Sequence, residues 1–122
     1  MHNLVGLTVF LLLLSVSGAL RAEGSATKGK RFSEANCVRC HVVSEQTRNA
    51  GIGSTPSFFL LSSLGDYHER FSTFFERRPH PAFVKMENAE RWTELPSPII
   101  PFKVSVENLD DVIAYIETLR PE

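Results

Sequence analysis

Two thiols and an imidazole lie within five residues of this chain, at Cys37, Cys40 and His41 in the stretch CVRCH, and the chain has no other cysteine. Redox dithiols, zinc sites and covalently attached haem all use clusters of this kind. A redox dithiol is typical of a βαβ setting, and no strand pattern accompanies this one. A structural zinc ion needs four ligands, and no second pair is present. The spacing favours haem, with both thiols bonded to vinyl groups and the imidazole on the iron.

The residues around this cluster resemble a known family. The stretch GKRFSEANCVRCH (29–41) is similar to the N-terminal helix of small class I cytochromes c, which read G-K-x-x-x-x-x-N-C-x-x-C-H. The stretch DDVIAYIETL (110–119) resembles the C-terminal helix of the same family, which reads D-[LIV]-x-A-Y-[LI]-x-x-L. The resemblance covers both ends of the chain well and the middle poorly.

This resemblance implies an all-α, cytochrome c-like fold of several short helices with long loops around one covalently bound haem c. The two terminal helices would cross, with Gly29 of the first against Tyr115 of the last. The segment STPSF is similar to the family loop whose proline carbonyl accepts a hydrogen bond from the proximal histidine. In this chain Pro56 would accept from Nδ1 of His41.

The sixth iron ligand is where the chain departs from the family pattern. Family members usually place a methionine shortly before the C-terminal helix, and here Ile99 and Ile100 occupy that stretch. A second alignment, through RRPHPAF, puts Phe83 at the methionine position. Neither isoleucine nor phenylalanine can bind iron.

Three possibilities for the sixth iron ligand remain open. Met86 is the only methionine after the leader and is our candidate sixth ligand; a His–Met pair would raise the haem potential. His80, between two prolines, would give bis-His ligation and a lower potential, and His68 is a further donor. With no protein ligand, a dry distal pocket lined by Ile99, Ile100 and Phe83 would bind NO or CO.

Helical periodicity accounts for most of the chain after the leader. Ser105 is a good N-cap for the last helix, and an apolar stripe at helical spacing follows it. No period-two pattern of useful length predicts a strand, which again favours an all-α fold. The predicted helices span 26–36, 58–64, 66–78, 83–95 and 106–120.

The first 22 residues have the composition of a secretory signal peptide. An apolar run, LVGLTVFLLLL (4–14), precedes small residues that suit cleavage after Ala19 or Ala22. A membrane span needs about 20 apolar residues, so an uncleaved anchor is the less favoured alternative. We therefore expect a signal peptide over 1–22, an exported cytochrome c domain over 23–122, and no stable membrane span after cleavage.

The net charge and the residue types of the chain argue against two classes of function. The formal net charge is −1, so nothing suggests binding to nucleic acid. No nucleophile–base pair points to an enzyme. We expect a periplasmic monohaem cytochrome that carries single electrons between redox protein partners, alone or as a subunit of a redox complex. The alternative is a ligand-binding or sensing haem protein. Candidates to pair with haem propionates, none singled out by the sequence, are Arg70, Arg77, Arg78, Arg91 and Trp92.

Overall fold

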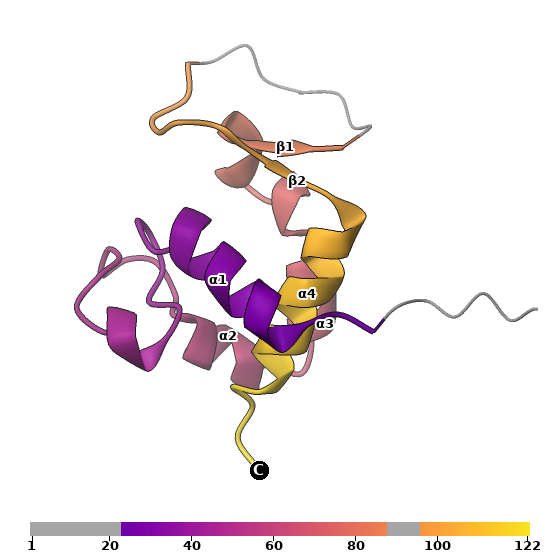
Figure 1. Cartoon of the computed structure of the whole chain (residues 1–122). Helices are drawn as coiled ribbons and strands as arrows, with labels where there is room; N and C mark the ends of the chain where they lie inside the picture. Colours follow the sequence, from indigo (N-terminus) through magenta and orange to yellow (C-terminus); the bar gives the residue numbers. More distant parts are fainter. Residues whose placement is uncertain (1–22, 88–95) are drawn as a thin grey trace, which may run out of the picture.

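The computed structural model of the chain describes residues 23–87 and 96–122 (Figure 1). These residues do not include the expected signal peptide, Arg91, Trp92 or most of the helix predicted over 83–95. Four helices are described: α1 (Ala26–Asn36), α2 (Phe58–Ser63), α3 (Tyr67–Ser72) and α4 (Val106–Glu117). Three 3₁₀ turns and two strands join them: η1 (Glu45–Thr47), η2 (Phe74–Glu76), η3 (His80–Ala82), β1 (Val84–Met86) and β2 (Phe102–Val104).

The two terminal helices cross and form the centre of the fold, as the family resemblance implied (Figure 1). Each begins at a serine whose hydroxyl accepts a backbone N–H: Ser25 from Lys28 and Ser105 from Asn108. The backbone N–H of Ser25 also donates to the buried carboxylate of Asp111 at 2.6 Å. This bond ties Ser25, the residue before α1, to the middle of α4.

Gly29 permits this crossing by a close contact with main chain. A Cβ atom built on Gly29 would overlap the backbone carbonyl of Asp111 and lie 2.9 Å from the backbone nitrogen of Val112. The atoms nearest to this Cβ therefore belong to the main chain of α4 and not to the Tyr115 ring that the resemblance implied.

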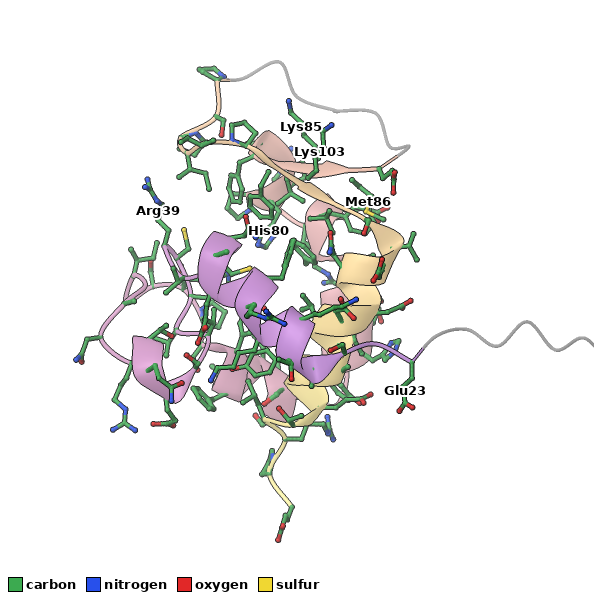
Figure 2. All side chains as sticks on the ribbon, in the orientation of Figure 1. Glu23, Arg39, His80, Lys85, Met86 and Lys103 are labelled. Atoms are coloured by element: carbon green, nitrogen blue, oxygen red, sulfur yellow. The ribbon has the colours of Figure 1, made fainter. Side chains whose placement is uncertain are left out.

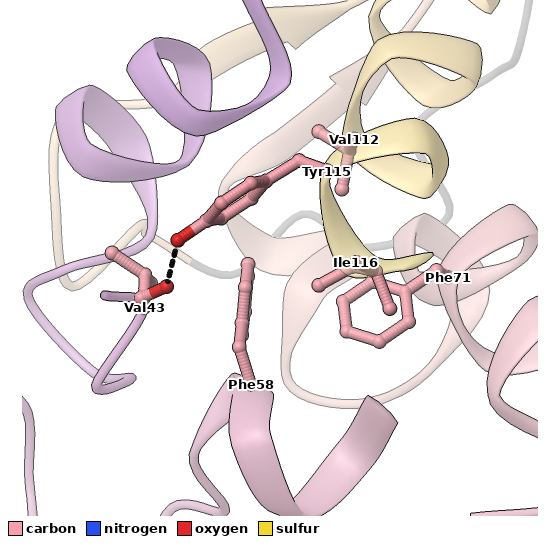
Figure 3. Close-up of a cluster of buried hydrophobic side chains, with 6 residues drawn as sticks. All are labelled: Val43, Phe58, Phe71, Val112, Tyr115 and Ile116. Atoms are coloured by element: carbon pink, nitrogen blue, oxygen red, sulfur yellow. Dashed lines mark hydrogen bonds between the residues drawn. The ribbon is translucent and has the colours of Figure 1, made fainter. Parts of the chain in front are cut away.

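Tyr115 instead belongs to the main apolar cluster (Figure 3). Its side chain is buried, and its hydroxyl donates to the carbonyl oxygen of Val43 at 2.7 Å. Val43 lies two residues after His41, so this bond holds the loop that follows the CVRCH stretch against α4. The buried members of the cluster are Val43, Phe58, Phe71, Val112, Tyr115 and Ile116.

The fold is dominated by helices, as expected, but it also contains a short pair of strands that the sequence did not predict. β1 and β2 are parallel, with Val84 opposite Phe102 and Met86 opposite Val104. Val84 and Val104 are buried in a second apolar cluster with Phe83 and Leu109. Each strand has three residues, too few for an alternating pattern to stand out in the sequence. The helix predicted over 83–95 is accordingly wrong at 84–86.

None of the helices in 23–87 and 96–122 is both long enough and apolar enough to cross a membrane.

Substituting Gly29 by alanine should destabilise the protein strongly. The added methyl group would strike backbone of α4, which cannot move aside as a flexible side chain can, so we expect the free energy of unfolding to fall by about 3 kcal/mol. The matched control is Gly53→Ala, where an added Cβ meets nothing within 4 Å. That variant should be unchanged or up to about 1 kcal/mol more stable. Denaturant unfolding of the holoproteins measures both, and equal midpoints would contradict the crossing described here.

Tyr115→Phe should cost more stability than the same change at the chain's other tyrosine. It leaves the buried carbonyl of Val43 without its donor, and we expect a loss of about 1.5 kcal/mol. The Tyr67 hydroxyl makes a long 3.5 Å contact with Glu117 at the surface, and the ring contacts of Tyr67 are kept in phenylalanine, so Tyr67→Phe should change stability by less than about 0.5 kcal/mol. Thermal and denaturant unfolding measure the stability of the two variants. Equal losses of stability would contradict a stabilising hydrogen bond from the Tyr115 hydroxyl.

Candidate haem-binding site

The CVRCH stretch forms a tight turn at the end of α1. Cys37 caps the helix, and its backbone N–H donates to the Ser33 carbonyl at 2.8 Å. The N–H groups of Cys40 and His41 both return to the carbonyl of Cys37, at 3.1 and 2.9 Å. This turn directs both thiols and the imidazole into one cavity of about 390 Å³.

The lining of the cavity is mostly apolar, and its volume lies in the range of small-molecule and cofactor sites, roughly 300–1,000 Å³. Six phenylalanines line it, from α1, α2, α3, η2 and the segments around the strands: Phe32, Phe58, Phe71, Phe74, Phe83 and Phe102. A flat apolar macrocycle needs such walls, so the residues present fit a haem group. Four of these phenylalanines lie between residues 58 and 83, and Phe32 and Phe102 come from segments distant in sequence.

His41 is held in a defined orientation. Its Nδ1 lies 2.7 Å from the carbonyl oxygen of Pro56, which confirms the predicted contact. A carbonyl oxygen only accepts hydrogen bonds, so Nδ1 carries the hydrogen and Nε2 keeps a lone pair for a metal. Burial lowers the pKa of His41, while the hydrogen bond to Pro56 acts in the opposite direction. The ring is therefore neutral at neutral pH, as an iron ligand must be.

The two thiols do not behave as a reactive redox pair or a zinc site. Burial, with a smaller contribution from the charge of Cys40, raises the pKa of Cys37 to about 12, so its thiol stays protonated at neutral pH. Across 23–87 and 96–122, no group of three or more His, Cys, Asp or Glu side chains could hold a metal ion. The donor set fits haem attachment better than either alternative.

His80 lines the same cavity from η3. Its ring lies 6.1 Å from the ring of His41, centroid to centroid, and the two planes are within 8° of parallel. Its Nδ1 lies 2.9 Å from the carbonyl oxygen of Arg77. Burial is the main cause that lowers the pKa of His80, and its electrostatic interaction with the His41 ring lowers it further. Hydrogen bonds to the backbone carbonyls of Arg77 and Phe74 act against this shift.

The other residues considered for the distal side of the haem differ in whether they line the cavity. Met86 ends β1, packs against the second apolar cluster and does not line the cavity (Figure 2). His68 is exposed on α3. Phe83 and Ile99 line the cavity as expected, but Ile100 is 89% exposed, so its expected place in a distal pocket is wrong.

Three of the arginines considered for the propionates reach the cavity wall: Arg70, Arg77 and Arg78. Arg70 is paired with Asp66 at 2.8 Å, and Arg77 with Glu69 at 3.1 Å. The acidic partners hold these guanidinium groups in place while leaving further N–H donors for an anion. The sequence did not separate these arginines from the others, because their approach to the cavity depends on how α3 and η2 pack.

A comparison with protein families agrees with this site. The family model described as Cytochrome c matches residues 26–120, nearly all of the described chain. Searches of curated proteins and of solved structures gave no match. Haem c, bound covalently through a Cys-x-x-Cys-His motif, is the cofactor of that family, and Cys37 and Cys40 have the required spacing. The chain belongs to the cytochrome c family.

Proposed function

We propose that the chain is an exported, periplasmic monohaem cytochrome c that carries single electrons between redox protein partners. The observation that carries this proposal is the convergence of Cys37, Cys40 and His41 on one aromatic cavity. With only two cysteines, the chain can attach one haem through two thioethers. Haem iron supplies a one-electron couple, and the protein tunes it through axial ligands and exclusion of water.

Each part of the cavity has a task in this function. Cys37 and Cys40 anchor the macrocycle, so it is retained through every redox cycle. The hydrogen bond to Pro56 fixes the His41 ring, which keeps the proximal ligand in one orientation in both oxidation states. The phenylalanine walls keep water away from the iron, and Arg70 and Arg77 offer donors for the propionates.

The periplasmic location rests on residues 1–22, where a signal peptide is expected. Cleavage after Ala19 or Ala22 would release the domain that starts near Glu23. N-terminal sequencing of the protein from separated periplasmic and membrane fractions distinguishes a cleaved signal from a retained anchor. The cleaved form would begin after Ala19 or Ala22 in the periplasmic fraction, whereas the anchored form would keep Met1 and fractionate with membranes.

Binding or sensing of NO or CO is the less well supported alternative. It requires an iron whose distal position is open to small ligands. Ile99 and Phe83 would suit such a pocket, but the imidazole of His80 lies in the same cavity. Electron transfer therefore fits the cavity better.

Removing both thiols should abolish retention of the haem. We expect the mature wild-type protein to keep one haem per chain after denaturation and solvent extraction, and Cys37→Ala/Cys40→Ala to lose all of it, since no other cysteine can form a thioether. Intact mass and haem-stained denaturing gels measure this. Ser54→Ala, at the cavity edge, is the matched control and should retain haem fully. A wild-type protein without covalent haem would overturn the proposed function.

The holoprotein should exchange one electron reversibly. Potentiometric titration followed by optical absorbance is expected to fit a single one-electron Nernst curve, equal in the oxidative and reductive directions. A curve with two components, or irreversible loss of the signal, would argue against a monohaem carrier.

A further inference from the structure

The two imidazoles of the cavity are arranged as a pair. Their ring centroids are 6.1 Å apart and their planes nearly parallel. A metal held between two histidine nitrogens, at roughly 2.0–2.1 Å from each, places the ring centroids about 6 Å apart. The observed separation between His41 and His80 therefore fits two histidines that share one metal ion.

Both rings use the same nitrogen, Nδ1, to bind a main-chain carbonyl. Nδ1 of His41 is bonded to the carbonyl of Pro56, and Nδ1 of His80 to the carbonyl of Arg77. Because these acceptors have no hydrogen to give, each ring carries its hydrogen on Nδ1 and its lone pair on Nε2. Metal-binding histidines in proteins are typically held in this way. The arrangement of the proximal ligand is thus repeated on the distal side.

The surroundings of His80 fix its ring in place. Its backbone N–H and its Nδ1 both donate to the carbonyl of Arg77. The rings of Phe74 and Phe83 meet it edge-on, at 5.3 and 5.8 Å. The carbonyl of Phe83 in turn accepts the N–H of Phe102 at 3.0 Å, which ties this segment to β2. Simple aromatic packing explains the contacts with the phenylalanines, but not the anchoring of both Nδ1 atoms on main-chain carbonyls.

Met86 lacks each of these features. It lies in β1 opposite Val104, on the side of the second apolar cluster. Its side chain packs against that cluster and does not line the cavity. The methionine preferred on sequence grounds is therefore the less suitable ligand of the two.

We propose that His80 is the second axial ligand of the haem iron, through Nε2, and that this cytochrome is bis-histidine ligated. The proposal rests on the proposed function, since it requires a bound haem. Bis-His ligation gives a low-spin iron with a lower potential than a His–Met pair, and it closes the distal position to NO and CO.

The test begins with the unmodified holoprotein. Near-infrared magnetic circular dichroism and electron paramagnetic resonance of the oxidised protein separate two nitrogen ligands from one nitrogen and one sulfur. We expect the bis-nitrogen signature in the wild type and in Met86→Leu. A sulfur signature that disappears in Met86→Leu, or a high-spin wild type, would overturn the proposal without any change at His80.

His80→Ala then tests the ligand directly, with exposed His68→Ala as the matched histidine control. We expect His80→Ala to lose the low-spin spectrum and to recover it when imidazole is added. The reduced variant should also bind CO, at CO concentrations that leave the spectrum of the wild type unchanged. His68→Ala should behave as the wild type. An unchanged low-spin spectrum in His80→Ala would refute the assignment. If His80→Ala does not accumulate, the spectra of the wild type and Met86→Leu still decide the question.

Failure of this proposal can be told apart from failure of the proposed function. A wild type with covalent haem and a ligand other than His80 rejects only the axial assignment. A wild type with no covalent haem rejects the function from which the assignment follows.

Discussion

The contact between the main chains of α1 and α4 at Gly29 determines where every other part of the site lies. α1 ends at Cys37, so the depth at which it packs on α4 sets the position of both thiols and of His41. Asp111 takes part in this contact in two ways. Its backbone carbonyl faces Gly29, and its buried carboxylate accepts a hydrogen bond from the backbone N–H of Ser25, the residue before α1. A side chain at position 29 would push α1 outward and displace the CVRCH turn relative to the phenylalanine walls, which come from other elements.

Main-chain carbonyls orient the chemistry of the cavity. The acceptors for both imidazoles are backbone groups, supplied by Pro56 in the loop before α2 and by Arg77 at the end of η2. Backbone acceptors move only when the segment moves, so the rings are oriented by the fold before any metal binds. This reduces the reorganisation needed when the site is filled and favours one defined ligand geometry. The loops of this protein are therefore parts of the site, and their short turns η2 and η3 have a positioning role equal to that of the helices.

Much of the proximal half of the site could be predicted from sequence, because its signals are local: the Cys-x-x-Cys-His spacing, the capped terminal helices, and the proline near residue 56. The distal half could not. Met86, His80 and His68 are all competent donors in sequence, and only their placement on β1, η3 and the exposed side of α3 separates them. The strand pair escaped prediction because each strand is short and its partner lies far along the chain. Ile99 and Ile100 show the same limit, since the sequence does not say which of two neighbouring isoleucines faces inward: Ile99 lines the cavity and Ile100 is exposed.

Side-chain hydrogen bonds that join distant parts of the chain have a consequence for how the protein folds. The bond from Ser25 to Asp111 spans 86 positions, and that from Tyr115 to Val43 spans 72. Helical proteins usually fold fast because most of their contacts are local, whereas contacts between distant residues require large loops to close first. This chain is helical in composition but must bring its two ends together before its core can form. We expect it to fold more slowly than a helical bundle of equal length, and the docking of the terminal helices to be the step that limits the rate.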